Sequence, residues 1–134
     1  MKICLDTDGL VSAFATRGLA ADVLRVVLAE HELLVSELIL VEFRRALEKK
    51  IRAPADRIAF AEQLLRAQTL IPEVAALASP KVRDPADARV LTSAVAGGAD
   101  ILVTGDADLL TLAAGSSIPI LSPRELWERL RGAS

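Results

Sequence analysis

The chain has 134 residues, which is enough for one domain whose core hides about two-thirds of the unfolded surface. Hydrophobic residues make up 52% and charged residues 25%, so the composition excludes a disordered chain and a disulfide-dense miniprotein. A formal net charge of -2 and an aromatic content of 3% exclude nucleic-acid binding through a broad positive field or a stacking platform. Any contact with RNA or DNA must therefore be local.

Short aliphatic runs alternate with helical patterns along the chain. In chain order, we predict a strand over Lys2–Asp6, a helix over Leu19–Leu28, a strand over Leu33–Ser36, helices over Glu37–Lys50 and Ala55–Ala67, a marginal strand over Thr69–Ile71, a loop over Ser79–Asp84, a helix over Pro85–Ala96 that Gly97-Gly98 ends, a strand over Ile101–Thr104, a short helix over Ala107–Ala113, a strand over Ile118–Leu121 and a last helix from Pro123. This alternation is typical of parallel strands joined by helical crossovers.

The predicted fold class is α/β, with three α/β/α layers around a central, mainly parallel sheet of four to five strands. We find no internal repeat and no linker, so we expect a single domain over residues 1–134. In such a fold, ligands bind outside the carboxyl ends of the strands.

Several classes of protein are disfavoured by single residues. Cys4 is the only cysteine, which excludes an intrachain disulfide and a paired-cysteine zinc site, and we expect it to be buried. The only histidine, His31, stands between two glutamates at a predicted helix end, so a nucleophilic triad is disfavoured. Asp6 comes too early for a signal peptide, and no apolar run reaches the roughly 18 residues of a membrane span. We therefore expect a cytoplasmic protein without membrane contact.

Acidic residues occupy positions where the pattern calls for apolar or neutral groups. Asp6 and Asp8 close the first predicted strand, and Glu42 falls on or beside the buried stripe of its helix. Asp87 and Asp106 each precede the apolar positions of their helices by three, four and seven residues, and so continue the inward faces. Buried carboxylates are costly unless they have partners.

Each acid also has an ordinary structural explanation. Asp84, Pro85 and Asp87 are what a plain helix start prefers, and Asp106 could cap the short helix that follows it. The segment from Asp6 to Gly9 could be a turn. Helix capping or turn formation is therefore an alternative explanation for Asp6, Asp8, Asp87 and Asp106, each taken alone.

The acids are harder to explain together. Parallel strands one and four end at the same edge of the sheet, which brings Asp6 and Asp106 to the region of Asp87. Such carboxylates would repel by about 4 kcal/mol per close pair at an effective dielectric near 20. Because no histidine, cysteine or lysine is adjacent to these acids, we expect a hard divalent cation, Mg²⁺ or Mn²⁺. Sites of this kind serve phosphodiester hydrolysis by an activated water.

Four motifs carry a resemblance to a known family. They are Leu5-Asp6-Thr7-Asp8, Glu42-Phe43-Arg44-Arg45, Arg83-Asp84-Pro85-Ala86-Asp87-Ala88 and Val103-Thr104-Gly105-Asp106-Ala107-Asp108-Leu109-Leu110. In order and approximate spacing, over about residues 2–128, the chain resembles the PIN domain family of small metal-dependent ribonucleases. Many members are VapC-like toxins of prokaryotic toxin-antitoxin pairs.

The resemblance implies a site and a reaction. It implies an endoribonuclease, a hydrolase in which one or two Mg²⁺ or Mn²⁺ ions, held directly or through water, activate a water against RNA. The implied catalytic acids are Asp6, Glu42, Asp87 and Asp106, with Asp108 as a further metal ligand and with Thr7, Asp8 and Thr104 orienting the acids. Many members carry a neutral residue in place of Asp8, which leaves open whether Asp8 is a ligand or only adds charge.

The expected partners are an RNA substrate, a second copy of the chain and an antitoxin. The hydrophobic content exceeds what one small core needs, which favours a homodimer and a captured partner peptide. The resemblance implies that an antitoxin lies in an apolar groove and extends a basic side chain to the acidic site.

Two alternatives remain at this point. The run from Leu5 to Leu10 also resembles the opening motif of haloacid-dehalogenase-like phosphatases, with Asp6 as nucleophile and Asp8 as acid and base, but that reading leaves Glu42 and Asp87 unexplained. A PIN-like binding module without activity is the second alternative. The basic residues Arg44, Arg45, Lys49 and Lys50 could guide an RNA backbone, but we interpret them as a solvated helix face.

Overall fold

The core of the molecule is one parallel sheet. The computed structural model describes residues 1–72, 85–111 and 113–132, with the backbone alone for residues 85–89 and 114. Five strands pair in the order β3-β2-β1-β4-β5, and every neighbouring pair is parallel. They are β1 (Lys2–Leu5), β2 (Glu32–Ser36), β3 (Thr69–Ile71), β4 (Ile101–Val103) and β5 (Ile120–Leu121). The predicted parallel α/β sheet is confirmed.

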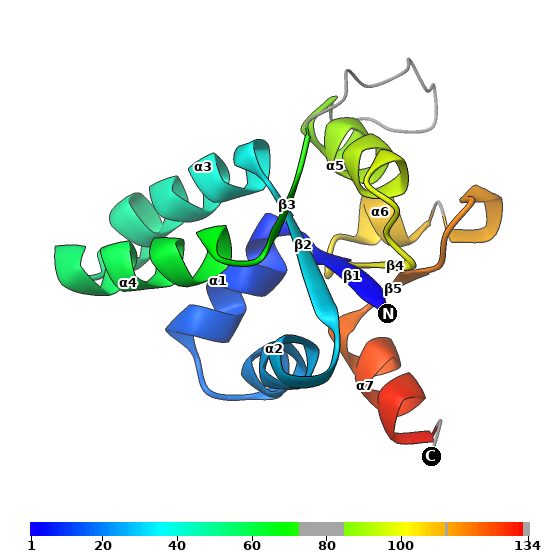
Figure 1. Cartoon of the computed structure of the whole chain (residues 1–134), viewed down its shortest axis with the longest axis horizontal. Coiled ribbons are helices and arrows are strands. Elements are labelled where there is room, and N and C mark those ends of the chain that lie inside the picture. Colours follow the sequence, from blue (N-terminus) through cyan, green and yellow to red (C-terminus); the bar gives the residue numbers. More distant parts are fainter. Residues whose placement is uncertain (73–84, 112, 133–134) are drawn as a thin grey trace.

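Helices flank the sheet on both sides, as the three-layer prediction requires (Figure 1). They are α1 (Thr7–Ala15), α2 (Leu19–Glu30), α3 (Glu37–Ala46) with a π-helical extension η1 (Leu47–Ile51), α4 (Ala55–Arg66), α5 (Pro85–Ala96), α6 (Ala107–Leu110), the short 3₁₀ turn η2 (Ala113–Gly115) and α7 (Pro123–Gly132). Helices α2 and α7 pack together, and α3 packs beside α4. None of the helices in the described ranges is long and apolar enough to cross a membrane.

Strand β1 lies at the centre of the sheet and of the core. Ile3, Cys4 and Leu5 are buried, which a continuous apolar run between two parallel neighbours requires. The prediction that Cys4 is buried is confirmed. Phe43 of α3 is also fully buried and packs edge-on against Phe14 of α1, with their ring centroids 5.3 Å apart. This contact holds α1 and α3 together.

The sequence prediction missed helix α1. Asp6 and Asp8 were expected to close a strand, but β1 ends at Leu5 and Asp8 lies in the first turn of α1. The reason is that Asp6 caps the helix, because its side-chain oxygen accepts a hydrogen bond from the amide of Gly9. Leu10 then buries its side chain in the core. A capping aspartate and a turn aspartate look alike in sequence.

Other boundaries moved by a few residues. The strand expected over Ile118–Leu121 is only Ile120–Leu121, and the short helix after Asp106 ends at Leu110 rather than Ala113. The expected helix over Glu37–Lys50 changes to π geometry at Leu47. The loop predicted over Ser79–Asp84 lies outside the described residues.

The π-helical extension ends in an unusual backbone conformation. Arg52 has φ 55° and ψ 44°, and it is the sole non-glycine residue with positive φ in the described part of the chain. The amides of Arg52 and Ala53 both bond to the carbonyl of Leu47, which is the closed end expected for a left-handed helix terminus. The helix therefore ends at Ile51, and the chain changes direction before α4 begins at Ala55.

The Gly97-Gly98 pair ends α5 as predicted, and a different structural requirement explains glycine at each position. Gly98 has φ 84°, a conformation that favours glycine. At Gly97 the reason is space, since a Cβ there would lie 2.7 Å from Cγ2 of Ile71. Ile71 is buried in β3, so α5 and the edge strand meet without room for one methyl group.

We expect Gly97→Ala to lower the free energy of unfolding by about 1–3 kcal/mol, because the new methyl group overpacks against Ile71. Gly132→Ala is the matched control, since a Cβ at Gly132 meets nothing within 4 Å. Urea denaturation of both variants measures the difference. Equal midpoints for the two would contradict the close approach at Gly97.

Candidate active site

A pocket of about 430 Å³ lies where β1 and β4 end. Its position agrees with the expectation for parallel α/β sheets, in which ligands bind beyond the carboxyl ends of strands. The lining residues come from the starts of α1 and α6, from one face of α3 and η1, and from α5. They are Asp6, Thr7, Asp8, Glu42, Arg45, Ala46, Lys49, Lys50, Val90, Asp106 and Leu109.

Asp6 is the most enclosed acid of the pocket, with only 6% of its surface exposed. Its Oδ1 accepts a hydrogen bond of 2.9 Å from the amide of Gly9, and its Oδ2 accepts one of 2.5 Å from the hydroxyl of Thr104. Its own amide donates to the carbonyl of Val103 at 3.1 Å. Asp6 is thereby fixed to both the helix that follows it and the neighbouring strand.

Thr104 connects the two acids that end β1 and β4. Its fully buried hydroxyl donates to Asp6 and accepts a 3.0 Å hydrogen bond from the amide of Asp106. Asp106 in turn caps α6, because its Oδ1 accepts a 2.8 Å bond from the amide of Asp108. Helix capping and membership of the pocket were weighed as alternatives for Asp106, and the structure shows both together.

Glu42 reaches the same pocket from α3. It is half-buried, beside the core stripe as predicted, and its Oε2 accepts a 2.9 Å hydrogen bond from the hydroxyl of Thr7. Because Thr7 directly follows Asp6 in the chain, this bond holds α3 against the start of α1. The positions of both carboxylates are therefore set by threonine hydroxyl groups.

The electrostatics of the pocket raise the pKa of Asp6 above its ordinary value. Burial is the largest cause, and the nearby carboxylates of Asp8 and Asp106 add to it. The hydrogen bonds from Thr104 and Gly9 act in the opposite direction without offsetting burial. Burial, together with the charge of Asp6, also raises the pKa of the Cys4 thiol to about 12. Negative charge in this pocket is thus held at a cost in the absence of a bound cation.

Comparison with known proteins agrees with this geometry. Residues 2–108 match the family model described as PIN domain. The chain belongs to the PIN domain family. Among solved structures it is similar to VapBC2 from Rickettsia felis bound to a DNA fragment from their promoter, with 14% sequence identity, coverage of 91% of this chain and 98% of that chain, and a TM-score of 0.63. That likeness shows a shared fold. No curated protein sequence matches the chain closely enough to add to the comparison.

The PIN domain brings together most of the acids predicted to form its site. Asp6, Asp8, Glu42 and Asp106 all line the pocket, whereas Asp108 is exposed and is not among the lining residues. The side chain of Asp87 lies outside the described part of the structure. Its backbone lies in the first turn of α5, three residues before Val90, which does line the pocket.

The oxygen donors of the pocket fit a hard divalent cation, because carboxylates without histidine or cysteine suit Mg²⁺ or Mn²⁺. The described residues do not by themselves form a ready ligand set, since no three acidic, histidine or cysteine side chains among them are grouped to hold a metal ion. The PIN domain would therefore need a side chain beyond the described ones, or a shift of those present, to complete the coordination of a cation.

From sequence alone, a solvated helix face is the favoured interpretation of the basic residues that line the PIN domain's pocket. The acids were expected to lie without lysines beside them, yet Arg45, Lys49 and Lys50 line the same pocket. These residues follow Glu42 at three, seven and eight positions, which is the spacing of one helix face. That spacing is the signal that could have identified them.

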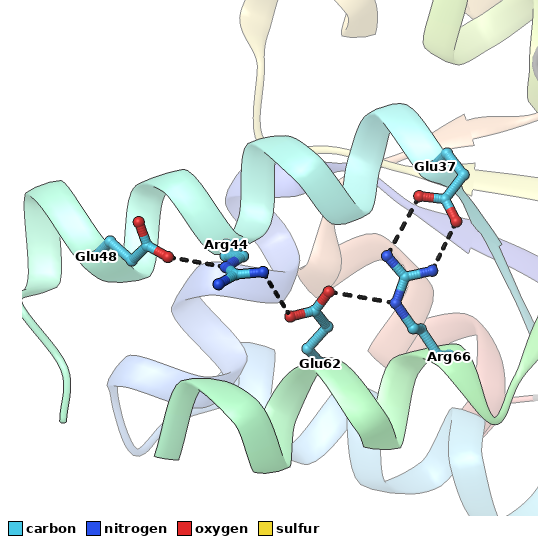
Figure 2. Close-up of polar contacts among 5 residues, drawn as sticks. All are labelled: Glu37, Arg44, Glu48, Glu62 and Arg66. Atoms are coloured by element: carbon cyan, nitrogen blue, oxygen red, sulfur yellow. Dashed lines mark hydrogen bonds and ion pairs between the residues drawn. The ribbon is translucent and has the colours of Figure 1, made fainter. Parts of the chain in front are cut away.

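Arg44 behaves differently from its neighbour Arg45. It pairs with Glu48 at 2.8 Å and with Glu62 of α4 at 3.6 Å. Arg66 of α4 joins the same group, bonding Glu62 at 3.2 Å and Glu37 at 2.6 Å (Figure 2). This five-residue network connects α3 to α4 beside a second cavity, which Arg45 and Lys49 also line. All four basic residues are exposed, as a solvated helix face requires, and Arg45, Lys49 and Lys50 also line the pocket.

We expect acidification to stabilise this PIN domain relative to its Asp6→Asn variant when a chelator is present. The folded-state pKa of Asp6 is raised, so the folded protein takes up a proton before the unfolded chain does, and stability increases as the pH falls. Between roughly pH 7 and pH 4, the difference in free energy of unfolding between wild type and variant should change by about 1.4 kcal/mol for each unit by which the pKa of Asp6 is raised. Urea denaturation of both proteins at the two pH values measures it.

The variant itself is the control in this comparison. Asp6→Asn keeps an oxygen that can accept from Gly9, and every other titrating group, including Glu37 whose pKa Arg66 lowers, is common to both proteins. A difference in stability that does not change with pH would show that Asp6 does not titrate as the structure indicates.

Proposed function

We propose that this PIN domain is a metal-dependent endoribonuclease that hydrolyses RNA phosphodiester bonds at the pocket beyond β1 and β4. The observation that carries the proposal is the pair Asp6 and Asp106, joined through the hydroxyl of Thr104 in a pocket that also contains Glu42. Carboxylates that line one pocket beside a buried aspartate are the kind of group that binds a divalent cation for phosphodiester hydrolysis.

In this proposal, Asp6, Glu42, Asp87 and Asp106 are the catalytic acids and would hold Mg²⁺ or Mn²⁺, with Asp108 as a further ligand. When bound, the ion supplies an activated water and neutralises charge on the phosphate. The chain's own residues orient this arrangement: Thr104 fixes Asp6 and the start of α6, and Thr7 fixes Glu42. Asp8 lines the pocket and adds negative charge beside Asp6.

We further propose that the protein is the toxin of a toxin-antitoxin pair and acts on RNA in the cytoplasm as a homodimer. The toxin role is supported by membership of the PIN domain family and by a fold shared with VapBC2, which was solved bound to a fragment of promoter DNA. An apolar-walled groove of about 650 Å³, lined in part by Phe14, Leu47 and Phe60, lies between α1, η1 and α4. It is the described surface that best suits the predicted antitoxin segment.

We expect purified protein to cleave a mixed pool of structured RNA with Mg²⁺ or Mn²⁺, and to lose the activity in excess chelator. Asp6→Asn and Asp106→Asn should each lower the rate by at least about 100-fold while the fold persists, because an amide keeps the capping oxygen but loses the charge. Gel analysis of the products measures cleavage, and circular dichroism checks the fold.

Asp56→Asn provides the matched control, because it makes the same change at an exposed position in the first turn of α4, away from the pocket. Undiminished cleavage by both pocket variants would overturn the proposal. Binding of RNA without cleavage by any form would favour the alternative of a PIN-like binding module.

The close approach of Gly9 to Asp6 gives a further prediction, about the position of the Asp6 carboxylate. A Cβ at Gly9 would lie 3.1 Å from Oδ1 of Asp6, so Gly9→Ala must displace that carboxylate by a few tenths of an ångström. Since a shift of about 1 Å at a reacting group can cost about 100-fold, we expect a roughly tenfold lower kcat. Alanine is also the better helix former by about 0.5–1 kcal/mol, so stability should not fall in parallel. Ser12→Ala, at an exposed site in the same helix, is the control.

A further inference from the structure

One face of α3 and η1 carries an acidic residue at one end and basic residues at the other. Glu42, Arg45, Ala46, Lys49 and Lys50 all line the pocket, and their spacing places them on one side of the helix. The acid lies at the end nearest Asp6, to which Thr7 connects it, and the basic residues follow one and two turns later. The pocket is therefore acidic at the ends of β1 and β4 and basic along the helix.

The three basic residues of this face are available for a ligand. Among the residues that the structure describes, neither Arg45, Lys49 nor Lys50 forms an ion pair, whereas Arg44 is held by Glu48 and Glu62. Figure 2 shows that Arg44 points toward α4. Adjacent arginines thus have separate roles, one in fastening two helices and the other in the wall of the pocket.

Stabilisation of the helix end does not by itself explain the arrangement. Basic residues in a last turn favour the helix macrodipole, and Lys49 and Lys50 occupy such positions. That effect is indifferent to the face on which the charges lie, and it does not require Arg45, which lies a turn earlier. Here all three share the one face that contains Glu42 and borders the acids.

The distance from the acid of this face to its last lysine suits an extended polyanion. At about 1.5 Å of rise per residue in α3, and less in the π-helical η1, Lys50 lies roughly 10 Å along the helix from Glu42. One phosphate group cannot occupy such a length, but consecutive phosphates of a nucleic-acid strand can. The chain's net charge of -2 also requires that any RNA contact be local. Arg45, Lys49 and Lys50, which we call the basic wall of the pocket, form such a local positive surface.

We infer that Arg45, Lys49 and Lys50 form a subsite for the RNA backbone flanking the cleaved bond, an inference that rests on the proposed function. The substrate strand leaves the acids of the pocket along α3 and η1 toward the closed helix end at Arg52. These side chains contact phosphates and do not contact the bases. The subsite therefore sets the affinity for RNA and the register of the strand, but not the sequence preference. In this scheme they are positioning residues.

The test compares two triple variants with the same loss of charge. Arg45→Ala/Lys49→Ala/Lys50→Ala removes the wall, and Arg17→Ala/Arg124→Ala/Arg129→Ala removes three exposed charges that line none of the described pockets. Binding of fluorescent single-stranded RNA is measured by anisotropy at several salt concentrations, in chelator and in an Asp106→Asn background, so that cleavage cannot interfere. Competing double-stranded DNA is included in parallel.

For the wall variant we expect at least about tenfold weaker RNA binding, equally for unrelated sequences. The salt slope should be lower by about 2, or about 0.7 for each RNA phosphate that is no longer neutralised. With metal, and with Asp106 restored, its KM for RNA cleavage should rise about tenfold while kcat stays within roughly threefold. The control triple should match the parent protein in affinity and in salt slope.

The outcomes separate this inference from the proposed function. Cleavage by wild type, with affinity and slope that do not differ between the two triple variants, overturns the subsite and leaves the nuclease intact. Weaker binding by the wall variant, with no cleavage by any form, supports the subsite and overturns the nuclease. A loss confined to DNA, or a loss that varies with RNA sequence, overturns the assignment to the RNA backbone.

Discussion

The hydrogen bond from the Thr104 hydroxyl to Asp6 is the interaction on which the functional edge depends. It joins residues 98 positions apart and connects the two central strands directly at the point where each ends. The same hydroxyl accepts from the Asp106 amide, so one buried side chain sets two acids and the start of α6. Without it, Asp6 would bury an oxygen with no partner, at a cost of about 1–3 kcal/mol or more for a charged group. Asp6 can cap α1 and border the pocket because Thr104 satisfies its other oxygen.

The pocket separates charge in a way that the rest of the fold supports. Acids converge where strands β1 and β4 end, since parallel strands present their carboxyl ends at one edge. Bases are carried by a helix that the core fixes through Phe43 and Leu47, and the ion network between α3 and α4 holds its outer side. This arrangement holds Asp6, whose pKa is raised, in the folded protein at a cost in stability, as is common in active sites.

The parts of the structure that depend on local pattern were predictable. Helix α5 and strand β3 have the boundaries expected from the sequence, because a proline start, a glycine end and a short run with β-branched Thr69 and Ile71 are local signals. The meeting of Asp6 and Asp106 followed from topology, since parallel strands bring their ends together. Helix α1 was not predicted, because Asp6 reads equally well as a turn residue. The sequence could not separate a pocket-lining basic residue from a solvated one. Arg44 and Arg45 are neighbours in sequence but about 100° apart around the helix, and only tertiary packing decides which of them borders the pocket.

The central position of β1 has a consequence for the order in which the protein is made. Among the five strands described, β1 is made first although it lies in the middle of the sheet, and its neighbour β4 is made fourth. At roughly 5–20 residues per second, Thr104 follows Asp6 off the ribosome by about 5–20 seconds. During that interval the nascent chain contains Asp6, and later the helix that carries the basic residues, without the strand end whose Thr104 bonds Asp6. The pocket is therefore completed only after Asp106 and Leu109 have been made, later than strands β1 to β3 and the helices between them.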